Sequence, residues 1–120
     1  MGWGKKKLKQ FSMGKHLLLE VYDVKYDILN DKESLLNAMI CGIEAAKMHI
    51  LNVFTYNFEP QGVTIVIALS ESHVSCHTWP EKGSTAIDVY TCGPGNPNLI
   101  ANNIISYLKS DNFELREIER

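Results

Sequence analysis

The chain has 120 residues, of which 45% are hydrophobic and 22% are charged, and its formal net charge is −2 at pH 7. A chain of this length and composition forms one soluble domain, and no stretch approaches the roughly 20 consecutive apolar residues that a membrane span needs. The slightly acidic charge creates no overall field that would attract nucleic acid, so neither a nucleic acid nor a membrane is expected as a partner.

Residues 1–13 form an N-terminal arm that contains four lysines. The lysines are not followed by the apolar stretch of a secretory signal, and Lys6 stands where a myristoylation motif needs Ser or Thr. The chain has three cysteines and no CxxC spacing, which argues against a disulfide framework and for a reducing compartment. We therefore expect a cytoplasmic protein with a solvated arm and a single folded domain at 14–120.

The first half of this domain carries alternating strand and helix signals. An apolar run predicts a strand at 16–22, and Asn30 or Asp31 can cap a helix that runs to about His49. The apolar positions of this helix recur at helical spacing: Leu35, Leu36, Met39, Ile40, Ile43 and Ala46. β-Branched and aromatic residues then predict a strand at 50–58.

Three successive strands follow, joined by short turns. "EPQG" at 59–62 makes a turn, and 63–69 is apolar apart from one threonine, which is typical of a strand covered on both faces. Half-buried strands are predicted at 73–79 and 85–92, with "PEKG" turning between them.

The last predicted element is a helix. Asn96 followed by Pro97 suits a helix cap and first turn. An apolar stripe comes after it: Leu99, Ile100, Ile104, Tyr107 and Leu108. The tail from Phe113 has no clear assignment.

The element order β-α-β-β-β-β-α predicts an α+β two-layer sandwich. Short turns between successive strands make the sheet mainly antiparallel, with both helices on one face. The other face would be exposed in one chain, and a single helical layer over about five strands gives a thin core. We therefore predict that two copies dimerise sheet to sheet into a larger sandwich.

The stretch "SESHVSCHTWPEKG" at 70–83 is crowded with reactive groups. Ser72 lies at a strand junction that would expose its hydroxyl, and His77 and Cys92 lie on predicted neighbouring strands, so a nucleophile, a base and a weak acid could converge. In a regular strand, however, positions 72 and 77 point to opposite faces. Each residue also has a simpler interpretation, as a turn serine, a hydrogen-bonded histidine and a small core cysteine.

Two segments of the sequence resemble the short prokaryotic S-adenosylmethionine decarboxylases, which are pyruvoyl enzymes of polyamine synthesis. They are "GKHLLLEVY" at 14–22 and "FEPQGVTIVIALSESHVSCHTWPEKGSTAIDVYTCG" at 58–93. The pieces "SESH", "HTWPE" and "IDVYTCG" have the order and spacing of that family. The resemblance runs from Gly14 to Leu108.

This resemblance implies that the chain cleaves itself between Glu71 and Ser72, into a β chain of residues 1–71 and an α chain of residues 72–120. Ser72 Oγ would attack the Glu71 carbonyl carbon to form an ester, and elimination would convert Ser72 into a pyruvoyl group. That group would form a Schiff base with the substrate and replace pyridoxal phosphate as the electron sink.

The resemblance also implies roles in processing and catalysis for three further residues. His77 would remove the α-proton of Ser72, and Thr64 would hydrogen-bond the cleavage intermediate. Cys92 would return a proton to the α-carbon of the product. The implied reaction converts S-adenosylmethionine to decarboxylated S-adenosylmethionine and CO2 for spermidine synthesis, in a homodimer of αβ units.

Substrate recognition is implied for three residues. Phe58 and Trp79 match the aromatic pair that sandwiches the adenine ring, and aromatic faces also suit a cationic sulfonium. Glu81 matches the carboxylate that binds the ribose hydroxyls. The simpler interpretation of the two aromatic residues is core or interface packing.

Three other interpretations remain. Some relatives of this fold decarboxylate arginine or ornithine, although the adenine-type and ribose-type residues argue against those substrates. A zinc site would use four side chains of suitable type, but their spacing divides them between two sheet faces: His73, Cys76, His77 and Cys92. The chain could also be an uncleaved paralogue that binds and regulates an active partner.

The chain departs from the family pattern near the cleavage site. Thr64 stands where the family has a serine, Ile65 where it has a glycine, and Lys15 where arginine is common. "VSC" also precedes His77 where "LTI" is common. No catalytic group is removed, but threonine is stiffer than serine about χ1, so we expect slower self-cleavage than serine would give.

Overall fold

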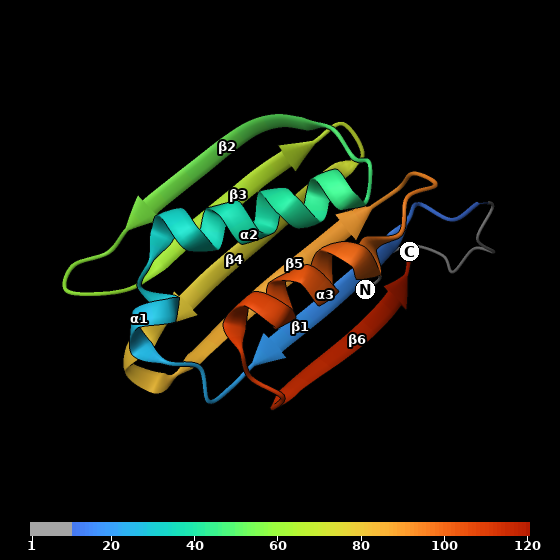
Figure 1. Ribbon diagram of the computed structural model, residues 1–120. Helices are drawn as coiled ribbons and strands as arrows, with labels where there is room; N and C mark the ends of the chain where they lie inside the picture. The colour runs from blue at the N-terminus through green and yellow to red at the C-terminus, as the bar shows by residue number, and fades with distance from the viewer. Residues whose placement is uncertain (1–10) are drawn as a thin grey trace, which may run out of the picture.

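The structure, a computed structural model, describes residues 11–120 and contains a six-stranded antiparallel sheet with helices on one face (Figure 1). In chain order the elements are β1 (Lys15–Val21), α1 (Tyr26–Leu29), α2 (Lys32–Ala45), β2 (Ile50–Asn57), β3 (Val63–Leu69), β4 (Ser72–Trp79), the 3-10 helix η1 (Pro80–Lys82), β5 (Ser84–Thr91), α3 (Pro97–Leu108) and β6 (Phe113–Glu119). This confirms the predicted α+β two-layer architecture. Residues 1–10 of the predicted arm lie outside the described residues.

The strand order in the sheet is β2-β3-β4-β5-β1-β6. Strands β2 to β5 form a meander, and β1 lies between β5 and β6. The sequence left the tail from Phe113 without an assignment, whereas the structure makes it the edge strand β6, which is exposed along its whole length. Because this strand buries no apolar face, it has no clear burial pattern to reveal it.

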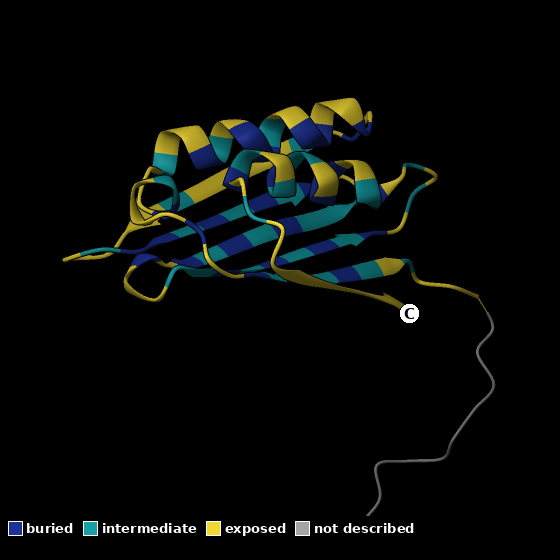
Figure 2. Cartoon of the chain, turned by 60° about the horizontal axis from the view of Figure 1, so that its bottom comes forward, coloured by how far each residue is buried: buried dark blue, intermediate teal, exposed yellow. Residues whose placement is uncertain are grey.

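One face of the sheet packs against α2 and α3 and forms the core, and residues along the inner strands β1, β3, β4 and β5 mostly alternate between buried and half-buried (Figure 2). We call the face away from the helices the open face. In β3 its members are Thr64, Val66 and Ala68, which are half-buried in the single chain. The prediction that β3 is covered on both faces is therefore not met within one chain.

Helix α2 begins where the sequence predicted and ends earlier. The Asp31 carboxylate accepts the backbone N–H of the third residue after it at 3.1 Å, which caps the helix and lowers the pKa of that carboxyl. Helix α2 ends at Ala45 instead of about His49, because Lys47 adopts a left-handed φ of 59° and Met48 N donates to Ile43 O at 3.1 Å. His49 therefore lies outside the helix, immediately before β2.

Helix α3 begins as predicted, with the Asn96 side chain accepting the Asn98 N–H at 3.0 Å. Its core-facing residues include Ile100, Ile104 and Leu108, while Leu99, which was assigned to the apolar stripe, is 42% exposed. Leu99 precedes the buried i, i+4, i+8 row by one position, which turns it away from the sheet. Within residues 11–120, no helix has the length and apolar character needed to cross a membrane.

Candidate active site

The predicted cleavage bond lies in a two-residue turn between β3 and β4. Ser72 is the first residue of β4 and has a φ of 143°, a value that residues other than glycine rarely adopt. It is held there by pairing with Leu69 on one side and Thr91 on the other. A backbone outlier of this kind stores about 1–3 kcal/mol and persists only where surrounding contacts enforce it. The bond between Glu71 and Ser72 is thus followed by a strained residue.

Cys92 lies directly beside this bond. Its backbone N–H donates to the Glu71 carbonyl oxygen at 2.9 Å. A donor on that oxygen polarises the carbonyl and favours attack at its carbon. Glu71, Ser72 and Cys92 form what we call the first half-site.

A second group of predicted residues gathers around His77. Thr64 and His77 are directly opposite in the β3–β4 register, and Thr64 Oγ1 lies 2.9 Å from His77 Nδ1. A pocket of about 400 Å³ adjoins this pair and has all five predicted residues of this group in its lining: Phe58, Thr64, His77, Trp79 and Glu81. We call these five residues the second half-site. The pocket has the size of a small-molecule site.

The aromatic residues of the second half-site are accessible. Phe58 is 50% exposed and Trp79 is 44% exposed, so neither is a core residue of the single chain. The Phe58 N–H donates to Gly62 O at 2.8 Å, which closes the turn after β2, and Phe58 lines the pocket from this turn. Glu81 is exposed in η1, two residues beyond Trp79. A planar ligand and a carboxylate partner for its hydroxyl groups could both be accommodated here.

The two half-sites lie at opposite ends of β4 in one chain. His77 follows Ser72 by five residues, which corresponds to about 17 Å along a strand. Ser72 pairs with buried residues of the helix-covered face, whereas His77 pairs with Thr64 and Ala86 of the open face. The structure therefore brings Ser72 and Cys92 together, as the sequence indicated, but keeps His77 away from both of them in the same chain.

The four side chains of zinc-ligand type do not form a cluster. Cys76 lies on the helix-covered face, where burial raises the pKa of its thiol to about 12, while His73 and His77 belong to the open face. Among residues 11–120 no group of three or more His, Cys, Asp or Glu side chains is arranged to hold a metal ion. The division between faces is the one that strand periodicity predicted.

The structure also places one residue at the first half-site that the sequence analysis missed. The backbone N–H of His49 donates to Glu71 Oε1 at 3.1 Å, and His49 Nδ1 lies 2.9 Å from Glu71 Oε2. These two contacts lower the pKa of the Glu71 carboxyl to about 2. His49 was expected at the end of a helix, 22 residues before Glu71. Nothing in the local sequence pattern links the two residues.

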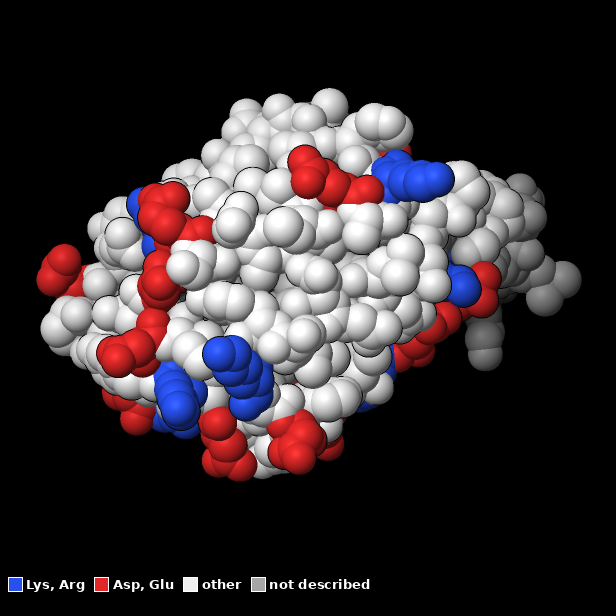
Figure 3. Space-filling view, in the orientation of Figure 1, with Lys and Arg blue, Asp and Glu red and all other residues white. Residues whose placement is uncertain are grey.

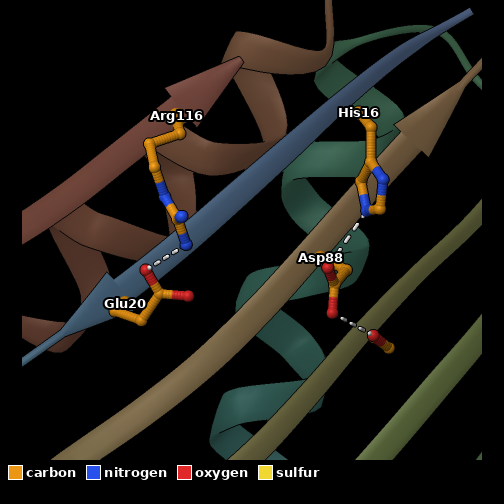
Figure 4. Close-up of polar contacts among 5 residues, drawn as sticks. His16, Glu20, Asp88 and Arg116 are labelled. Atoms are coloured by element: carbon orange, nitrogen blue, oxygen red, sulfur yellow. Dashed lines mark hydrogen bonds and ion pairs between the residues drawn. The ribbon is translucent and has the colours of Figure 1, made fainter. Parts of the chain in front are cut away.

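Strands β5, β1 and β6 carry paired polar groups on the open face (Figure 4). His16 Nε2 lies 3.0 Å from Asp88 Oδ1, and Arg116 donates to Glu20 Oε1 at 3.1 Å. Ser75 Oγ also donates to Asp88, at 3.4 Å.

On the side that carries the helices, charged residues lie around the rim of an uncharged surface (Figure 3).

Comparison with known proteins gives consistent results. Residues 15–120 match the protein family described as S-adenosylmethionine decarboxylase. An S-adenosylmethionine decarboxylase proenzyme 2 of Bacillus cereus (strain ZK / E33L) is 37% identical over 110 residues, which is 91% of this chain and 89% of that protein. An S-adenosylmethionine decarboxylase proenzyme of Synechococcus sp. (strain WH7803) is 41% identical over 109 residues, or 90% of this chain and 85% of that protein.

A solved structure is also similar. The crystal structure of the adenosylmethionine decarboxylase from Aquifex aeolicus VF5 matches with a TM-score of 0.85 and 33% sequence identity, over 91% of both chains. The family match continues past Leu108, where the sequence resemblance was expected to end, and it therefore includes β6.

Proposed function

The chain belongs to the S-adenosylmethionine decarboxylase family, and on this premise we propose that it is a self-cleaving, pyruvoyl-dependent enzyme. It converts S-adenosylmethionine to decarboxylated S-adenosylmethionine and CO2, and the product serves spermidine synthesis. The observation that supports self-cleavage most directly is the strained Ser72, next to a Glu71 carbonyl that accepts the Cys92 N–H at 2.9 Å. The proenzyme names of the relatives agree with this reading.

The first step of processing needs only groups of the first half-site. Ser72 Oγ attacks the Glu71 carbonyl carbon, the bond from that carbon to the Ser72 nitrogen breaks, and the hydroxyl proton ends on that nitrogen. The Cys92 N–H stabilises the negative charge that develops on the carbonyl oxygen. Relief of the strain at Ser72 favours the ester over the starting amide.

The second step needs a base. Removal of the Ser72 α-proton breaks the bond from Cβ to Oγ, and Glu71 leaves as a carboxylate that keeps this oxygen. The remaining dehydroalanine becomes an imine that takes up water and releases ammonia, which leaves the ketone. His77 is the proposed base, and since Thr64 Oγ1 engages its Nδ1 at 2.9 Å, Nε2 is the nitrogen that takes the proton.

Because His77 lies about 17 Å along the strand from Ser72 in the same chain, we propose that the base is supplied by a second copy. Two open faces that pack about a twofold axis running across the strands would bring the second half-site of one chain to the end of the sandwich at which the first half-site of the other chain lies. Sheet-on-sheet packing of this kind also covers the half-buried side chains of β3.

The second half-site suits S-adenosylmethionine in size and chemistry. The rings of Phe58 and Trp79 can hold adenine and attract the sulfonium cation, and the carboxylate of Glu81 can accept hydrogen bonds from ribose hydroxyls. Once formed, the pyruvoyl group supplies the electron sink for the pair released with CO2. Cys92, which is exposed beside Ser72, is the proposed proton donor to the product. Arginine and ornithine have neither a purine ring for the aromatic pair nor ribose hydroxyls for Glu81.

Two measurements test this function together. We expect the intact mass of purified protein to show two fragments, 1–71 and 72–120, with a borohydride-reducible carbonyl on the second. CO2 should be released from carboxyl-labelled S-adenosylmethionine and not from arginine or ornithine, and a Ser72→Ala chain should stay whole and inactive. An unbroken wild-type chain without a reducible carbonyl would refute the proposal and favour a regulatory paralogue, whereas release from arginine or ornithine would refute only the substrate.

A further inference from the structure

The Glu71 side chain contacts His49 through both of its carboxylate oxygens. Oε1 accepts the His49 backbone N–H at 3.1 Å, and Oε2 lies 2.9 Å from His49 Nδ1. The neighbouring Ser70 N–H donates to the His49 carbonyl oxygen at 3.0 Å. His49 thus holds the turn that contains the cleavage bond through both its backbone and its ring.

The opposite side of the same turn is held by the segment after β5. Cys92 N donates to the Glu71 carbonyl oxygen, and a Cβ atom on Gly93 would come within 3.2 Å of Glu71 Cγ. The Glu71 side chain is accordingly only 19% exposed, between Gly93 and the 75% exposed ring of His49. Glu71 is therefore held from two directions, which restricts how its carbonyl group can turn relative to the Ser72 hydroxyl.

These contacts bear on cleavage because a strained turn relaxes unless its neighbours hold it. Ser72 keeps a φ of 143° while the residue before it is clamped. The Glu71 carboxylate would also oppose the negative charge that forms on its own carbonyl oxygen during the attack. The contacts with His49 hold that carboxylate in one position and reduce the effect of its charge on the carbonyl oxygen.

We propose that His49 is a positioning residue for self-cleavage, which clamps the Glu71 side chain so that the Glu71 carbonyl carbon stays within reach of Ser72 Oγ. This inference rests on the proposed self-cleavage. His49 itself takes no part in bond making or breaking. It acts on the first step, the shift of the acyl group from nitrogen to oxygen.

The test compares two substitutions that differ only in the ring contact. His49→Leu removes the side-chain donor, whereas His49→Asn keeps an N–H at the position of Nδ1, and both retain the backbone contact to Oε1. Since a hydrogen bond to a charged acceptor is lost, we expect freshly made His49→Leu chain to cleave about tenfold more slowly than wild type. His49→Asn should restore the rate to within about twofold, and Glu33→Gln, on an 83% exposed side chain of α2, should leave it unchanged.

Hydroxylamine, which cleaves esters, identifies the step. A chain slowed at the acyl shift accumulates no ester, so His49→Leu should show no hydroxylamine-sensitive fraction, in contrast to His77→Ala, which should accumulate one. Cleavage of His49→Leu at the wild-type rate, or failure of His49→Asn to restore the rate, would overturn the inference. A wild-type chain that never cleaves would instead overturn the proposed function.

The melting temperature of His49→Leu in the uncleavable Ser72→Ala background shows whether this substitution destabilises the fold. If it does, the double variant His49→Leu/Glu71→Gln still tests the inference. Glu71→Gln removes the charge that the ring engages. If His49 acts through Glu71, the double variant should cleave no more slowly than the slower single variant. If the double variant slowed cleavage by the product of the two single-variant factors, His49 would act independently of Glu71 and the inference would be contradicted.

Discussion

At the scale of single residues, Thr64 shows how a small departure from a family pattern acts on chemistry. Its hydroxyl lies 2.9 Å from His77 Nδ1, so the threonine preserves the contact that orients the base. The additional methyl group restricts χ1, and the hydroxyl is less free to move from the ring to an intermediate.

We therefore expect Thr64→Ser to cleave about threefold faster than wild type, because serine samples χ1 more freely. Thr64→Val, which keeps the shape and loses the hydroxyl, should cleave at least about tenfold more slowly, since His77 loses its orienting partner. The fraction of uncleaved chain against time, resolved on a gel, gives both rates. Equal rates for threonine and serine would remove the explanation based on χ1.

The Glu71 carboxyl gives a prediction for pH. Its folded pKa of about 2 is below the ordinary value of 4.5, so the ionised carboxylate stabilises the folded chain more than the protonated form does. This contribution is complete above about pH 4.5 and is lost as the pH falls towards about 2.

In the uncleavable Ser72→Ala background, Glu71→Gln should accordingly lower the free energy of unfolding at about pH 6 and lower it by less at about pH 3. Urea denaturation at the two pH values measures this difference. If the difference in unfolding free energy between the two chains stayed constant with pH, the carboxylate charge would not be what His49 stabilises.

Residue type and order in the sequence were enough to nominate the site residues, but not to predict which of them lie close together in one chain. Ser72 and Cys92 meet as expected because they lie at adjacent ends of β4 and β5. His77 was expected near them, but the register places it at the other end of the strand, and strand periodicity alone had already indicated opposite faces. His49 could not be found, because its contact with Glu71 depends on where α2 stops.

At the scale of elements, local signals predicted most of the sheet. Strand β3 was predicted with its observed limits, and β4 and β5 each begin one residue earlier than expected. The errors occur where tertiary structure decides the outcome, as at the end of α2 and in the exposed β6.

The contact between α2 and α3 depends on Gly42. A Cβ atom at this position would lie 3.0 Å from Ile100 Cα, which is backbone and cannot move aside cheaply. Gly42→Ala gains up to about 1 kcal/mol of helix propensity but forces the helices apart, at a cost of about 1–3 kcal/mol.

We expect a net loss of about 1 kcal/mol in the free energy of unfolding for Gly42→Ala. Asn37→Ala, at an exposed position of the same helix, should raise this free energy by a few tenths of a kcal/mol. Chemical denaturation of both variants tests the pair. A Gly42→Ala chain more stable than wild type would show that the helices separate without cost.

At the scale of the whole molecule, the open face is suited to burial against a second copy. Phe54 and Tyr56 on β2 are 57% and 53% exposed there. Charged groups on β5, β1 and β6 form pairs on this face, His16 with Asp88 and Glu20 with Arg116 (Figure 4). Since pairing offsets part of the cost of removing charges from water, these pairs make it less costly to cover the face.

A shared site makes a prediction that a single-chain site does not. His77→Ala has an intact first half-site and Ser72→Ala an intact second half-site, and neither chain should cleave efficiently alone. In a mixed dimer, one site combines Ser72 of the first chain with His77 of the second, while the other site lacks both.

Co-expression of the two variants with different tags should therefore restore cleavage of the His77→Ala chain only. Random pairing of equal amounts limits this restoration to about half of that chain, because only mixed dimers contain a complete site. Intact mass of each tagged chain measures the result, and co-expression with a Ser72→Ala/His77→Ala double variant is the matched control. No cleavage in the mixture, under conditions where the two tags co-purify, would mean that His77 acts on Ser72 of its own chain.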